Sequence, residues 1–577
     1  MKEELLNFIS ENNLSPFNKQ RTPVKNGSES IFKTRDGKSV HNRVLIKISN
    51  NFVFPDTGNL LNFFSFTESL EEIKQRQVFF NELKKSINFD NSFLNFLLPL
   101  KQTWKPKYDV LVVTENSQTF MRLKEAGCPV RLLISESDIS LLESYDLIQI
   151  INCDEFSRAL ESLPQAVFLK SVEEVYLERH LEKLSSWKAN LEILRKGPIS
   201  EELNELVQEL SSLLDLTSES ESEEITRDSV ELAVDKINER VSDRLKDMMV
   251  SGDSLIAMIS KQILPPPIKS IVQEEVRKSN IPLEVLNLGI PVSIDEPELE
   301  KFLQRKNSSE YFDSAQKIKN NSFRIKEIPR KLQELSDFLI LFDFLSGTSK
   351  FVKDKTNFPL LSEELLIKNS KNIFLDHPRD ISFELNDVYR CSILTGANSG
   401  GKTTLLEHVL QLVSLAQLGF PISGEAKIPL FTDVYYFAKN KGSESKGAFE
   451  TLLTQMSKIK PGAKTLILAD EIESVTEPGV AGEIIAATAE FFLKQNCFLI
   501  VATHLGYEIQ KNLPILTRID GIEAKGLDEG FNLIVDHNPV LGRLAHSTPE
   551  LIVEKLANSE KTDYFIFLNS HLKNNKK

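Results

Sequence analysis

A glycine-rich stretch with one lysine, LTGANSGGKTTLLEHVL at residues 394–410, carries the chemistry of phosphate binding. It fits the pattern G-x-x-x-x-G-K-[ST]. Glycines let successive backbone N–H groups point inward around a phosphate, the lysine reaches the β- and γ-phosphate oxygens, and the threonine hydroxyl binds Mg²⁺. We therefore expect ATP and Mg²⁺ to bind here. The predicted nucleotide-binding residues are Gly396, Ala397, Asn398, Ser399, Gly400, Gly401, Lys402, Thr403 and Thr404.

Two later apolar runs end in polar residues that suit ATP hydrolysis. KTLILADE, residues 464–471, ends in Asp470 and Glu471, and adjacent acids are uncommon at a buried strand end because each unpaired charge costs several kcal/mol. We expect Asp470 to bind Mg²⁺ together with Thr403, and Glu471 to polarise the attacking water. FLIVATHLG, residues 498–506, contains His504, which is expected to sense the γ-phosphate or orient the water; a purely structural histidine is the alternative.

The elements that must position these side chains are strands and a helix. CSIL, residues 391–394, is expected to be a strand, and TTLLEHVLQLVSLA, residues 403–416, a helix. Strand, loop and helix then follow in the order that a phosphate loop requires, and the helix N-terminus adds its dipole to the site. Both later runs are also expected to be strands. The sequence therefore predicts an α/β unit after Phe351.

A second group of short apolar runs lies between residues 105 and 171. Helix-like segments separate the runs, and this alternation predicts a small α/β domain with a parallel sheet. The region contains no glycine-rich phosphate loop, so we expect it to act as a scaffold. The runs are DVLVVTE (109–115), PVRLLIS (129–135), LIQIIN (147–152) and AVFLKS (166–171).

Apolar residues at helical spacing predict helices on both sides of that domain. In FTESLEEIKQRQVFFNELKK, residues 66–85, Leu70, Ile73, Val78 and Leu83 recur at roughly helical steps. Two further stripes predict long, narrow helices that act as levers or antiparallel pairs, with an ordinary bundle core as the alternative. The stripes are Leu177, Leu181, Leu184, Trp187, Leu191 and Leu194, and Val230, Val234, Ile237, Val241, Leu245 and Met248.

Two polar or proline-rich segments punctuate these helices. The acidic tract SESESEE, residues 218–224, cannot pack and is expected to be a loop or hairpin tip. LPPP, residues 264–267, is expected to break a helix because prolines lack the backbone N–H donor.

The bulk composition limits the classes of function. With 577 residues, 41% hydrophobic and 26% charged, the chain is expected to form several globular domains. No apolar run reaches the roughly 18 residues of a membrane span, and the start lacks a signal-peptide core, so we expect a cytoplasmic protein without membrane contact. The cysteines are expected to be reduced and mostly buried rather than bound to metal or paired; they are Cys128, Cys153, Cys391 and Cys497.

The net charge of −14 gives the chain no bulk attraction to nucleic acid. Any contact with phosphate backbones must therefore come from local basic patches. Residues 1–59 are mildly basic, and we expect this segment either to touch nucleic acid or to form a solvated appendage.

The glycine-rich segment and the two apolar runs that end in polar residues resemble segments of the MutS family. The family's phosphate loop has the form GxNxxGK[ST], and here it reads GANSGGKT, with Asn398 at the family's asparagine. The acidic strand is similar too: DEIESVTEPG has Thr476 six residues after the aspartate, as the family does. ATH, residues 502–504, matches the family's ATHY segment, with Leu505 in place of the tyrosine.

The resemblance extends beyond the ATP site. SLEEIKQRQVFFNEL, residues 69–83, is similar to the opening helix of the family's core domain. LAHSTPELIVEKLA, residues 544–557, resembles the helical element with which family members dimerise. The resemblance implies a homodimeric clamp that binds double-stranded DNA and hydrolyses ATP with Mg²⁺, acting in DNA repair or recombination.

Two departures from the family pattern refine that expectation. Members that read mismatches carry a Phe-x-Glu wedge in an N-terminal domain, and no candidate for it occurs in the N-terminal segment; the nuclease domain with which the bacterial branch usually ends is not seen in this sequence either. We therefore expect a short archaeal-type MutS relative that acts on branched or other non-mismatch structures.

A third departure concerns a contact between subunits. Family members send a serine across the dimer to the partner's ATP from an S-x-F-like segment, which here reads SESKGAFE at residues 443–450. Phe449 aligns, but Gly447 stands at the serine's place, so Ser445 or a backbone N–H is expected to substitute. A plain loop is the alternative.

The expected fold is multidomain, α and α/β: a helical core/lever domain with a small α/β insert precedes a P-loop, ABC-type α/β ATPase domain with a C-terminal helical dimerisation element. The expected domains are a basic N-terminal segment (1–59), the core/lever domain (60–104 and 172–350), the α/β insert (105–171), the ATPase domain (351–542) and the dimerisation element (543–577).

Two other functions remain open. The first is an ATP-driven remodeller of ribosomes or other RNA-containing complexes, since the sequence shows no DNA-cutting domain. The second is a chromosome-structural ATPase of the cohesin and Rad-type clamp class. That class ranks last, because its members place the phosphate loop near the N-terminus and carry an LSGG-like signature that this sequence lacks.

Overall fold

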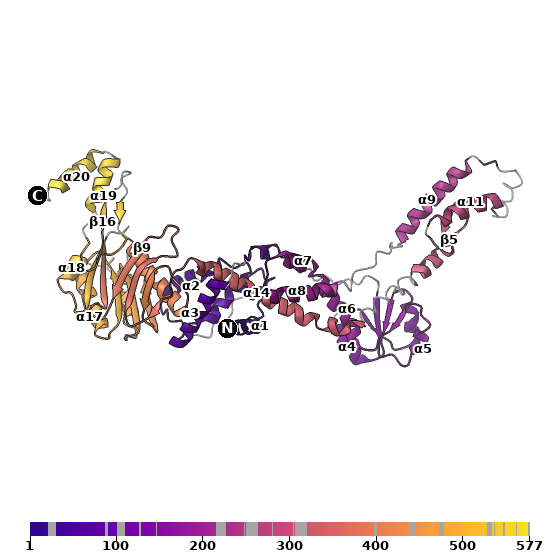
Figure 1. Ribbon diagram of the computed structural model, residues 1–577, viewed down its shortest axis with the longest axis horizontal. Helices are drawn as coiled ribbons and strands as arrows, with labels where there is room; N and C mark the ends of the chain where they lie inside the picture. The colour runs from indigo at the N-terminus through magenta and orange to yellow at the C-terminus, as the bar shows by residue number, and fades with distance from the viewer. Residues whose placement is uncertain are drawn as a thin grey trace. The chain divides into compact units, whose positions relative to one another are not determined.

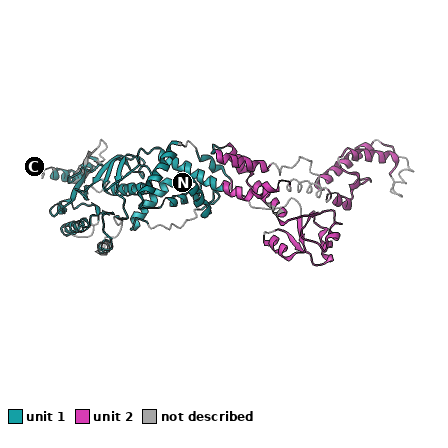
Figure 2. Cartoon of the chain, turned by 60° about the horizontal axis from the view of Figure 1, so that its bottom comes forward, with its two compact units in different colours: residues 1–97, 197–200, 336–577 teal, residues 98–196, 201–335 magenta. Residues whose placement is uncertain are grey.

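The computed structural model divides the chain into two compact units, which Figure 2 colours separately. Unit 1 comprises residues 1–97, 197–200 and 336–577, and unit 2 comprises residues 98–196 and 201–335. The five-domain division expected from the sequence is finer than this and stays a prediction. The structure describes all residues except 21–29, 87–89, 101–109, 126–127, 146, 215–226, 247, 250–263, 280, 304, 306–319, 397–400, 439–445, 472–477, 528–532, 536, 546–548, 561 and 575–577.

Figure 1 labels many of the elements. The helices of unit 1 are α1 (Lys2–Glu11), α2 (Arg35–Ser49), η1 (Pro55–Phe64), α3 (Leu70–Ser86), η2 (Ser92–Phe96), α15 (Lys402–Leu418), α16 (Lys446–Met456), α17 (Pro478–Leu493), α18 (Gly506–Gln510), α19 (Pro549–Ser559) and α20 (Asp563–Asn574). Its strands are β7 (Leu360–Leu361), β8 (Leu365–Lys371), β9 (Asp380–Leu385), β10 (Cys391–Gly396), β11 (Glu425–Ile428), β12 (Asp433–Phe437), β13 (Thr465–Asp470), β14 (Phe498–Ala502), β15 (Thr517–Ile522), β16 (Ala524–Leu527) and β17 (Leu533–Val535).

The helices of unit 2 are α4 (Ser117–Glu125), η3 (Glu136–Leu142), α5 (Ser157–Leu160), α6 (Val172–Ser185), α7 (Lys188–Lys196), α8 (Glu201–Leu214), α9 (Arg227–Leu245), α11 (Pro266–Arg277), η5 (Leu283–Val285) and α13 (Ser322–Lys326). Its strands are β1 (Val110–Thr114), β2 (Val130–Leu132), β3 (Leu147–Ile150), β4 (Ala166–Phe168), β5 (Leu286–Asn287) and β6 (Ser293–Ile294). Helix α14 (Ile328–Lys353) contains the boundary between the two units.

A five-stranded parallel sheet forms the centre of the α/β part of unit 1, with the order β12-β13-β14-β10-β15. Its inner strands are rich in apolar residues and buried along almost their whole length, because helices cover parallel sheets on both faces. Helices α15 and α17 both pack against it. The three strands expected in this region, at 391–394, 464–471 and 498–506, are confirmed. A second sheet, β7-β11-β8-β9, is mixed.

The N-terminal segment is folded into unit 1. Leu5 and Ile9 of α1 and Val44 and Ile48 of α2 are fully buried. Helix α2 packs against α15, the helix that follows the phosphate loop. The expectation of a solvated appendage is therefore wrong: the apolar residues of this segment lie far apart in the sequence but on one face of each helix.

Helix α3 is confirmed, but its buried face differs from the expected one. Ile73 and Leu83 are buried as expected, whereas Leu70 and Val78 are 48% and 56% exposed. Phe80 takes the central place, with its ring stacked 4.1 Å from the ring of Phe420. The expected face allowed a five-residue step from Ile73 to Val78, which no helix face accommodates.

One buried carboxylate organises the helical part of unit 1. Asp343 of α14 is fully buried and accepts hydrogen bonds from the backbone N–H groups of Val53 and Phe54, at 2.9 and 3.0 Å. The Thr57 hydroxyl and the Asn91 amide donate to it at 2.8 and 2.6 Å. Burial raises the pKa of the Asp343 carboxyl, and these four donors oppose the rise. The side chain thus connects segments that lie hundreds of residues apart.

The small α/β domain of unit 2 is confirmed as a four-stranded parallel sheet of order β2-β1-β3-β4. The four strands lie within the four apolar runs that predicted them. Glu115, just after β1, accepts backbone hydrogen bonds from residues 154–156 at 2.8–2.9 Å. These bonds lower the pKa of its carboxyl, although its partial burial opposes them. The carboxylate holds a loop in place, which agrees with a scaffold role.

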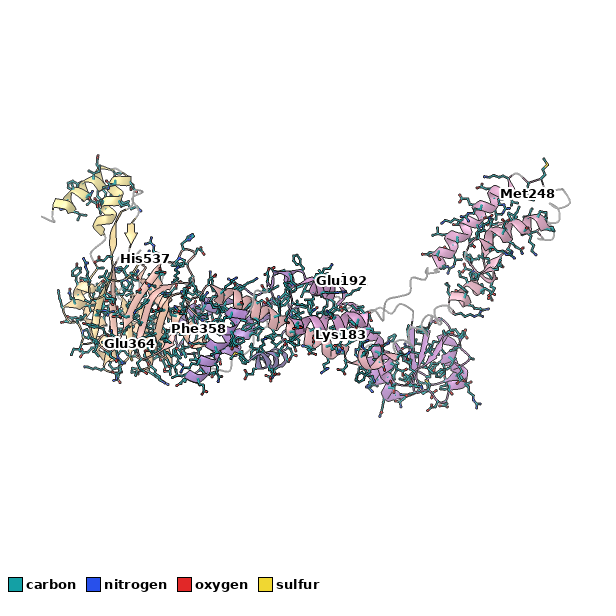
Figure 3. The ribbon with its side chains drawn as sticks, in the orientation of Figure 1. Lys183, Glu192, Met248, Phe358, Glu364 and His537 are labelled. Carbon is teal, nitrogen blue, oxygen red and sulfur yellow. The ribbon has the colours of Figure 1, made fainter. Side chains whose placement is uncertain are left out.

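The two apolar stripes of unit 2 are mostly buried, but neither lies entirely on one continuous helix. The first stripe runs over α6 and α7, which pack on α8, so the bundle-core interpretation fits it better than a single lever. Lys183 and Glu192 lie on the exposed side (Figure 3). The second stripe lies on α9 and packs on Val272 and Val276 of α11, while Met248 lies beyond the end of α9.

The remaining local expectations have mixed outcomes. The prolines at 265–267 stand at the start of α11, where the missing N–H groups lose no helical bond, rather than within a helix. The acidic tract at 218–224 lies outside the described residues. All four cysteines are buried. Within the described ranges, no helix is long and apolar enough to cross a membrane.

The Asp343 contacts predict a large effect of truncation. In the full-length protein, Asp343→Ala should lower the free energy of unfolding by about 3 kcal/mol, because buried backbone donors lose their acceptor. Thermal melting followed by circular dichroism measures this change. The exposed Asp376→Ala serves as the control and should change stability by less than about 0.5 kcal/mol. Equal melting of the two variants would contradict the role of Asp343.

Candidate nucleotide-binding site

The acidic pair lies where β13 ends beside β14. Asp470 stands opposite Ala502 in the parallel register, and the Glu471 N–H donates to the Ala502 carbonyl at 2.8 Å. Glu471 has φ +46°, a left-handed conformation that non-glycine residues seldom adopt. The sheet order therefore brings the acidic pair next to the residues that follow β14.

The ends of the phosphate loop are held in glycine conformations. Gly396 has φ +137°, and a Cβ placed on it would lie 2.5 Å from the Ile522 carbonyl oxygen of the neighbouring strand β15. Gly401 has φ +92° and precedes the first turn of α15. These two glycines are thus required by the backbone. Residues 397–400, which include the predicted Ala397, Asn398, Ser399 and Gly400, lie outside the described residues.

Lys402 is buried among three polar partners. Its side chain is 2% exposed, and its ammonium donates to the Gly396 carbonyl at 2.6 Å. The Glu471 carboxylate lies 3.8 Å away and His504 Nδ1 lies 3.3 Å away. A buried ammonium without such partners would cost several kcal/mol. The lysine is therefore held at the carboxyl edge of the sheet by the loop, the acidic strand and β14.

The partners of His504 determine its tautomer. Its Nε2 lies 2.8 Å from Glu471 Oε1, and its Nδ1 faces the Lys402 ammonium, which can only donate. Nδ1 therefore accepts, and Nε2 carries the proton and donates to Glu471. The side chain is 39% exposed, so a group entering from solvent can reach it. This arrangement favours the functional interpretation of His504 over a purely structural one.

Thr403 and Asp470 provide hard oxygen ligands at one point. The Thr403 hydroxyl donates to the Asp470 carboxylate at 2.6 Å, although the residues come from different elements. Hydroxyl and carboxylate oxygens suit Mg²⁺, which usually binds one or two carboxylates together with substrate phosphates. Together with the glycine turn and Lys402, this donor set fits Mg²⁺ and a nucleotide triphosphate. Thr404, in the same turn, is half-buried.

Two supporting groups were missed by sequence reasoning. The fully buried Asp520 of β15 accepts from Ser392 Oγ of β10 at 2.6 Å, which joins the two strands, and from Arg518 Nε of its own strand at 2.7 Å. The charged residues in TRIDGI, residues 517–522, were the available signal. His537 was missed as well. Its Nδ1 lies 3.0 Å from the position that a Cβ on Gly401 would take, and Figure 3 labels this histidine. No local pattern distinguishes it.

The predicted contact between subunits cannot be assigned a geometry. Ser445 lies outside the described residues, and so does Thr476. Phe449 falls in the first turn of α16, but its side chain is not among those described. The roles of Ser445 and Phe449 in that contact therefore stay predictions.

Comparison with known proteins agrees with the motifs. The chain is 28% identical over 578 aligned residues to the DNA-binding protein MutS2 of Pyrococcus furiosus, covering 93% of this chain and 98% of the relative. It is 26% identical to the Endonuclease MutS2 of Lactobacillus helveticus, over 36% of this chain and 28% of the relative. It is 28% identical to the DNA mismatch repair protein MutS of Thermotoga maritima, over 38% and 29% respectively. No protein-family model matches the chain.

The close approach at Gly396 predicts a local defect on substitution. Gly396→Ala should destabilise the β10–β15 edge by about 2 kcal/mol or more, because the new methyl group would meet the Ile522 carbonyl and the backbone is left-handed. Hydrogen–deuterium exchange of the β10 and β15 amides should become faster. Gly479→Ala is the matched control, since no atom lies within 4 Å of its added Cβ. Unchanged exchange in Gly396→Ala would refute the steric argument.

Proposed function

We propose that this chain, which is a MutS-related protein, hydrolyses ATP at the site around Lys402 and couples that reaction to DNA binding. The observation that carries the proposal is the convergence of Lys402, Thr403, Asp470, Glu471 and His504 at one edge of the five-stranded sheet. Three separate segments supply these side chains, and their types match the needs of phosphoryl transfer.

Each side chain has a role that follows from its contacts. When bound, ATP with Mg²⁺ supplies the γ-phosphoryl group that water attacks. Thr403 and Asp470 would hold the metal, and Lys402 would stabilise charge on the phosphate oxygens. The Glu471 carboxylate would accept a proton from the attacking water, because it is the carboxylate that faces His504. His504 positions Glu471 through its Nε2–H and presents its exposed edge toward solvent.

The DNA-binding part of the proposal is supported by the relative from Pyrococcus furiosus, whose name describes it as DNA-binding and which aligns over nearly the whole chain. We propose that the protein acts in DNA repair or recombination, as a homodimeric clamp on branched or other non-mismatch structures. Helix α20 has exposed apolar side chains, Tyr564, Ile566 and Phe567, that suit such a dimer contact. The protein would then work in association with the nucleoid.

The ATPase proposal is tested by two substitutions. Lys402→Ala should lower the rate of ATP hydrolysis at least about 100-fold, because the charge that faces the phosphates is lost. Glu471→Gln should keep nucleotide binding but slow hydrolysis by a similar factor, because the amide cannot accept the proton. Phosphate release and binding of a fluorescent ATP analogue measure the two effects. Lys368→Ala, an exposed residue of strand β8, should leave both unchanged; normal hydrolysis by Lys402→Ala would disprove the proposal.

The target is tested by a panel of labelled nucleic acids. We expect four-way and other branched DNA to bind more tightly than homoduplex or mismatched duplex, as measured by fluorescence anisotropy at fixed salt. Equal binding to all duplexes that salt abolishes would contradict structure-specific recognition. Co-sedimentation with ribosomes in place of DNA binding would instead favour the remodeller of RNA-containing complexes.

A further inference from the structure

The edge strand β12 is completed by a segment from the N-terminal region. Phe32 forms a parallel bridge with Val434, and the Lys33 N–H donates to the Val434 carbonyl at 2.9 Å. The Val434 N–H donates in turn to the Ile31 carbonyl at 2.8 Å. The edge of the sheet is therefore paired, and the residues at 31–33 have a defined place on it.

The first turn of α2 continues this attachment. Thr34 Oγ1 accepts a hydrogen bond from the Tyr436 N–H at 3.0 Å, and the Asp36 carboxylate accepts one from the Ala438 N–H at 3.2 Å. Residues at the start of α2 are thus held beside the carboxyl end of β12. Segments separated by some four hundred residues form one continuous surface.

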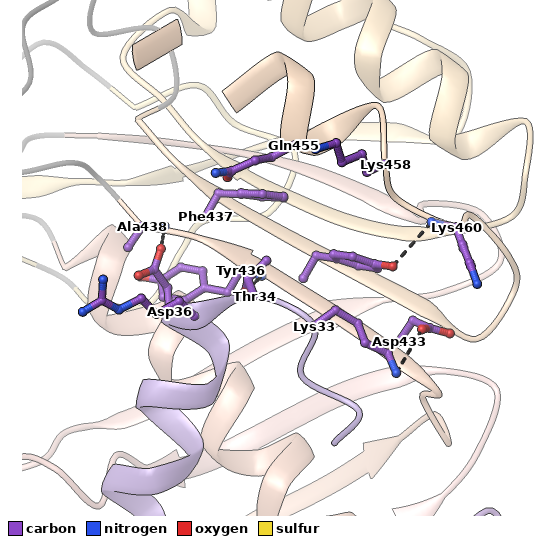
Figure 4. Close-up of a pocket in the computed structure, with 12 residues that line it drawn as sticks. Lys33, Thr34, Asp36, Asp433, Tyr436, Phe437, Ala438, Gln455, Lys458 and Lys460 are labelled. Carbon is purple, nitrogen blue, oxygen red and sulfur yellow. Dashed lines mark hydrogen bonds and ion pairs between the residues drawn. The ribbon is translucent and has the colours of Figure 1, made fainter. Parts of the chain in front are cut away.

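A cavity of about 690 Å³ opens on that surface, and we name it the edge pocket (Figure 4). Lys33 and Asp433 lie on one side of it, and Gln455 and Lys458 on the other. Its volume falls in the range of about 300–1,000 Å³ that is typical of small-molecule sites. The pocket has room for a base and its sugar as well as for a phosphate group.

The edge pocket is positively charged. Arg35, Lys458 and Lys460 line it, are exposed, and form no ion pair within the described part of the chain. Counting Lys33, four basic side chains in the lining outnumber its two acids; Asp433 lies 3.6 Å from Lys33, and Asp36 accepts the Ala438 N–H. The whole chain has a net charge of −14, whereas this surface is cationic. The local positive charge favours binding of an anionic ligand.

The basic surface continues along α2. A second hollow that shares Arg35 with the edge pocket is lined by Lys38 and Arg43 together with two small polar residues and Ile46. Lys38 is exposed and forms no ion pair among the described residues. The positive side chains therefore extend along α2 for more than two turns. This arrangement suits an extended anionic ligand better than a single phosphate ion.

An aromatic side chain is placed beside these cations. Tyr435 is half-buried in the lining, and its hydroxyl accepts the Lys460 N–H at 3.4 Å, which restrains the ring. Cations that follow a phosphate backbone combined with an aromatic ring that stacks on a base are the two components of single-strand recognition.

We propose that the edge pocket and the adjoining face of α2 bind single-stranded nucleic acid, with the phosphodiester backbone along Arg35, Lys38, Lys458 and Lys460 and a base against Tyr435. This inference rests on the proposed nucleic-acid binding of the protein and adds a site and a strand preference to it. A single strand is favoured because a base within a duplex cannot leave the stack to reach Tyr435 without loss of pairing.

The site is connected to the nucleotide-binding residues from two sides. Helix α2 packs on α15 through His41 and Ser414, at 2.7 Å, and through Arg43 and Glu407, at 2.9 Å. Strand β12 is the hydrogen-bonded neighbour of β13, which ends in Asp470. A strand bound in the edge pocket therefore contacts the two elements that flank the ATP site, and we expect it to stimulate hydrolysis.

The test compares two triple variants of the full-length protein. Lys38→Ala/Lys458→Ala/Lys460→Ala should bind an oligo-dT of about thirty nucleotides about tenfold more weakly, and the slope of log affinity against log salt should fall by about 2. Lys353→Ala/Lys368→Ala/Lys511→Ala removes the same charge from exposed lysines elsewhere in unit 1 and should leave both values unchanged. Basal ATP hydrolysis should be unchanged in both variants, whereas stimulation by oligo-dT should be lost only in the first.

A second pair of variants tests the base contact. Tyr435→Leu should weaken oligo-dT binding about tenfold and duplex binding much less, whereas Tyr435→Phe should retain the wild-type affinity. Equal affinities and salt slopes for the two lysine triples, with wild-type binding intact, would overturn this inference alone. A loss restricted to duplex DNA would overturn the single-strand assignment. A wild-type protein that binds no nucleic acid at all would overturn the proposed DNA binding as well.

Discussion

The buried ammonium of Lys402 is the interaction on which the arrangement of the nucleotide-binding part depends. A charge with 2% exposure needs partners, and here they come from the Gly396 carbonyl, the Glu471 carboxylate and His504. These groups can meet only if β10, β13 and β14 are adjacent and end at the same edge of the sheet. The parallel strand order and the position of α15 thus both serve to place these partners around the Lys402 ammonium.

Two separate sets of contacts hold the strands around that cluster in place. On one side, Asp520 of β15 accepts a hydrogen bond from Ser392 of β10 and another from Arg518 of its own strand, all in the buried interior. On the other side, β12 is covered by the start of α2, so the sheet has no free edge there. Contacts of this kind would hold the proposed catalytic arrangement in the defined geometry that phosphoryl transfer requires. The same contacts link the N-terminal segment to the ATP site.

The local elements were predictable from the sequence because their signals are local. Apolar runs of strand length located β1, β3, β10, β13 and β14, and glycine spacing located the turn before α15. The identity of Lys402, Thr403, Asp470, Glu471 and His504 followed from motif chemistry, and the structure brings all five together. The buried face of α3 was mispredicted, because exposure of Leu70 and Val78 depends on which neighbours cover the helix and not on spacing alone.

The sequence by itself determined which residues could form the proposed ATP site and the existence of two α/β regions, since both depend on residue type and short-range order. Only the tertiary structure decided where the N-terminal segment lies. Its basic residues appear in the sequence as a mild charge bias, whereas the fold sets them beside β12, some four hundred positions later. Pairings at that separation are specified by the packing of whole elements, and no periodicity within a short window contains them.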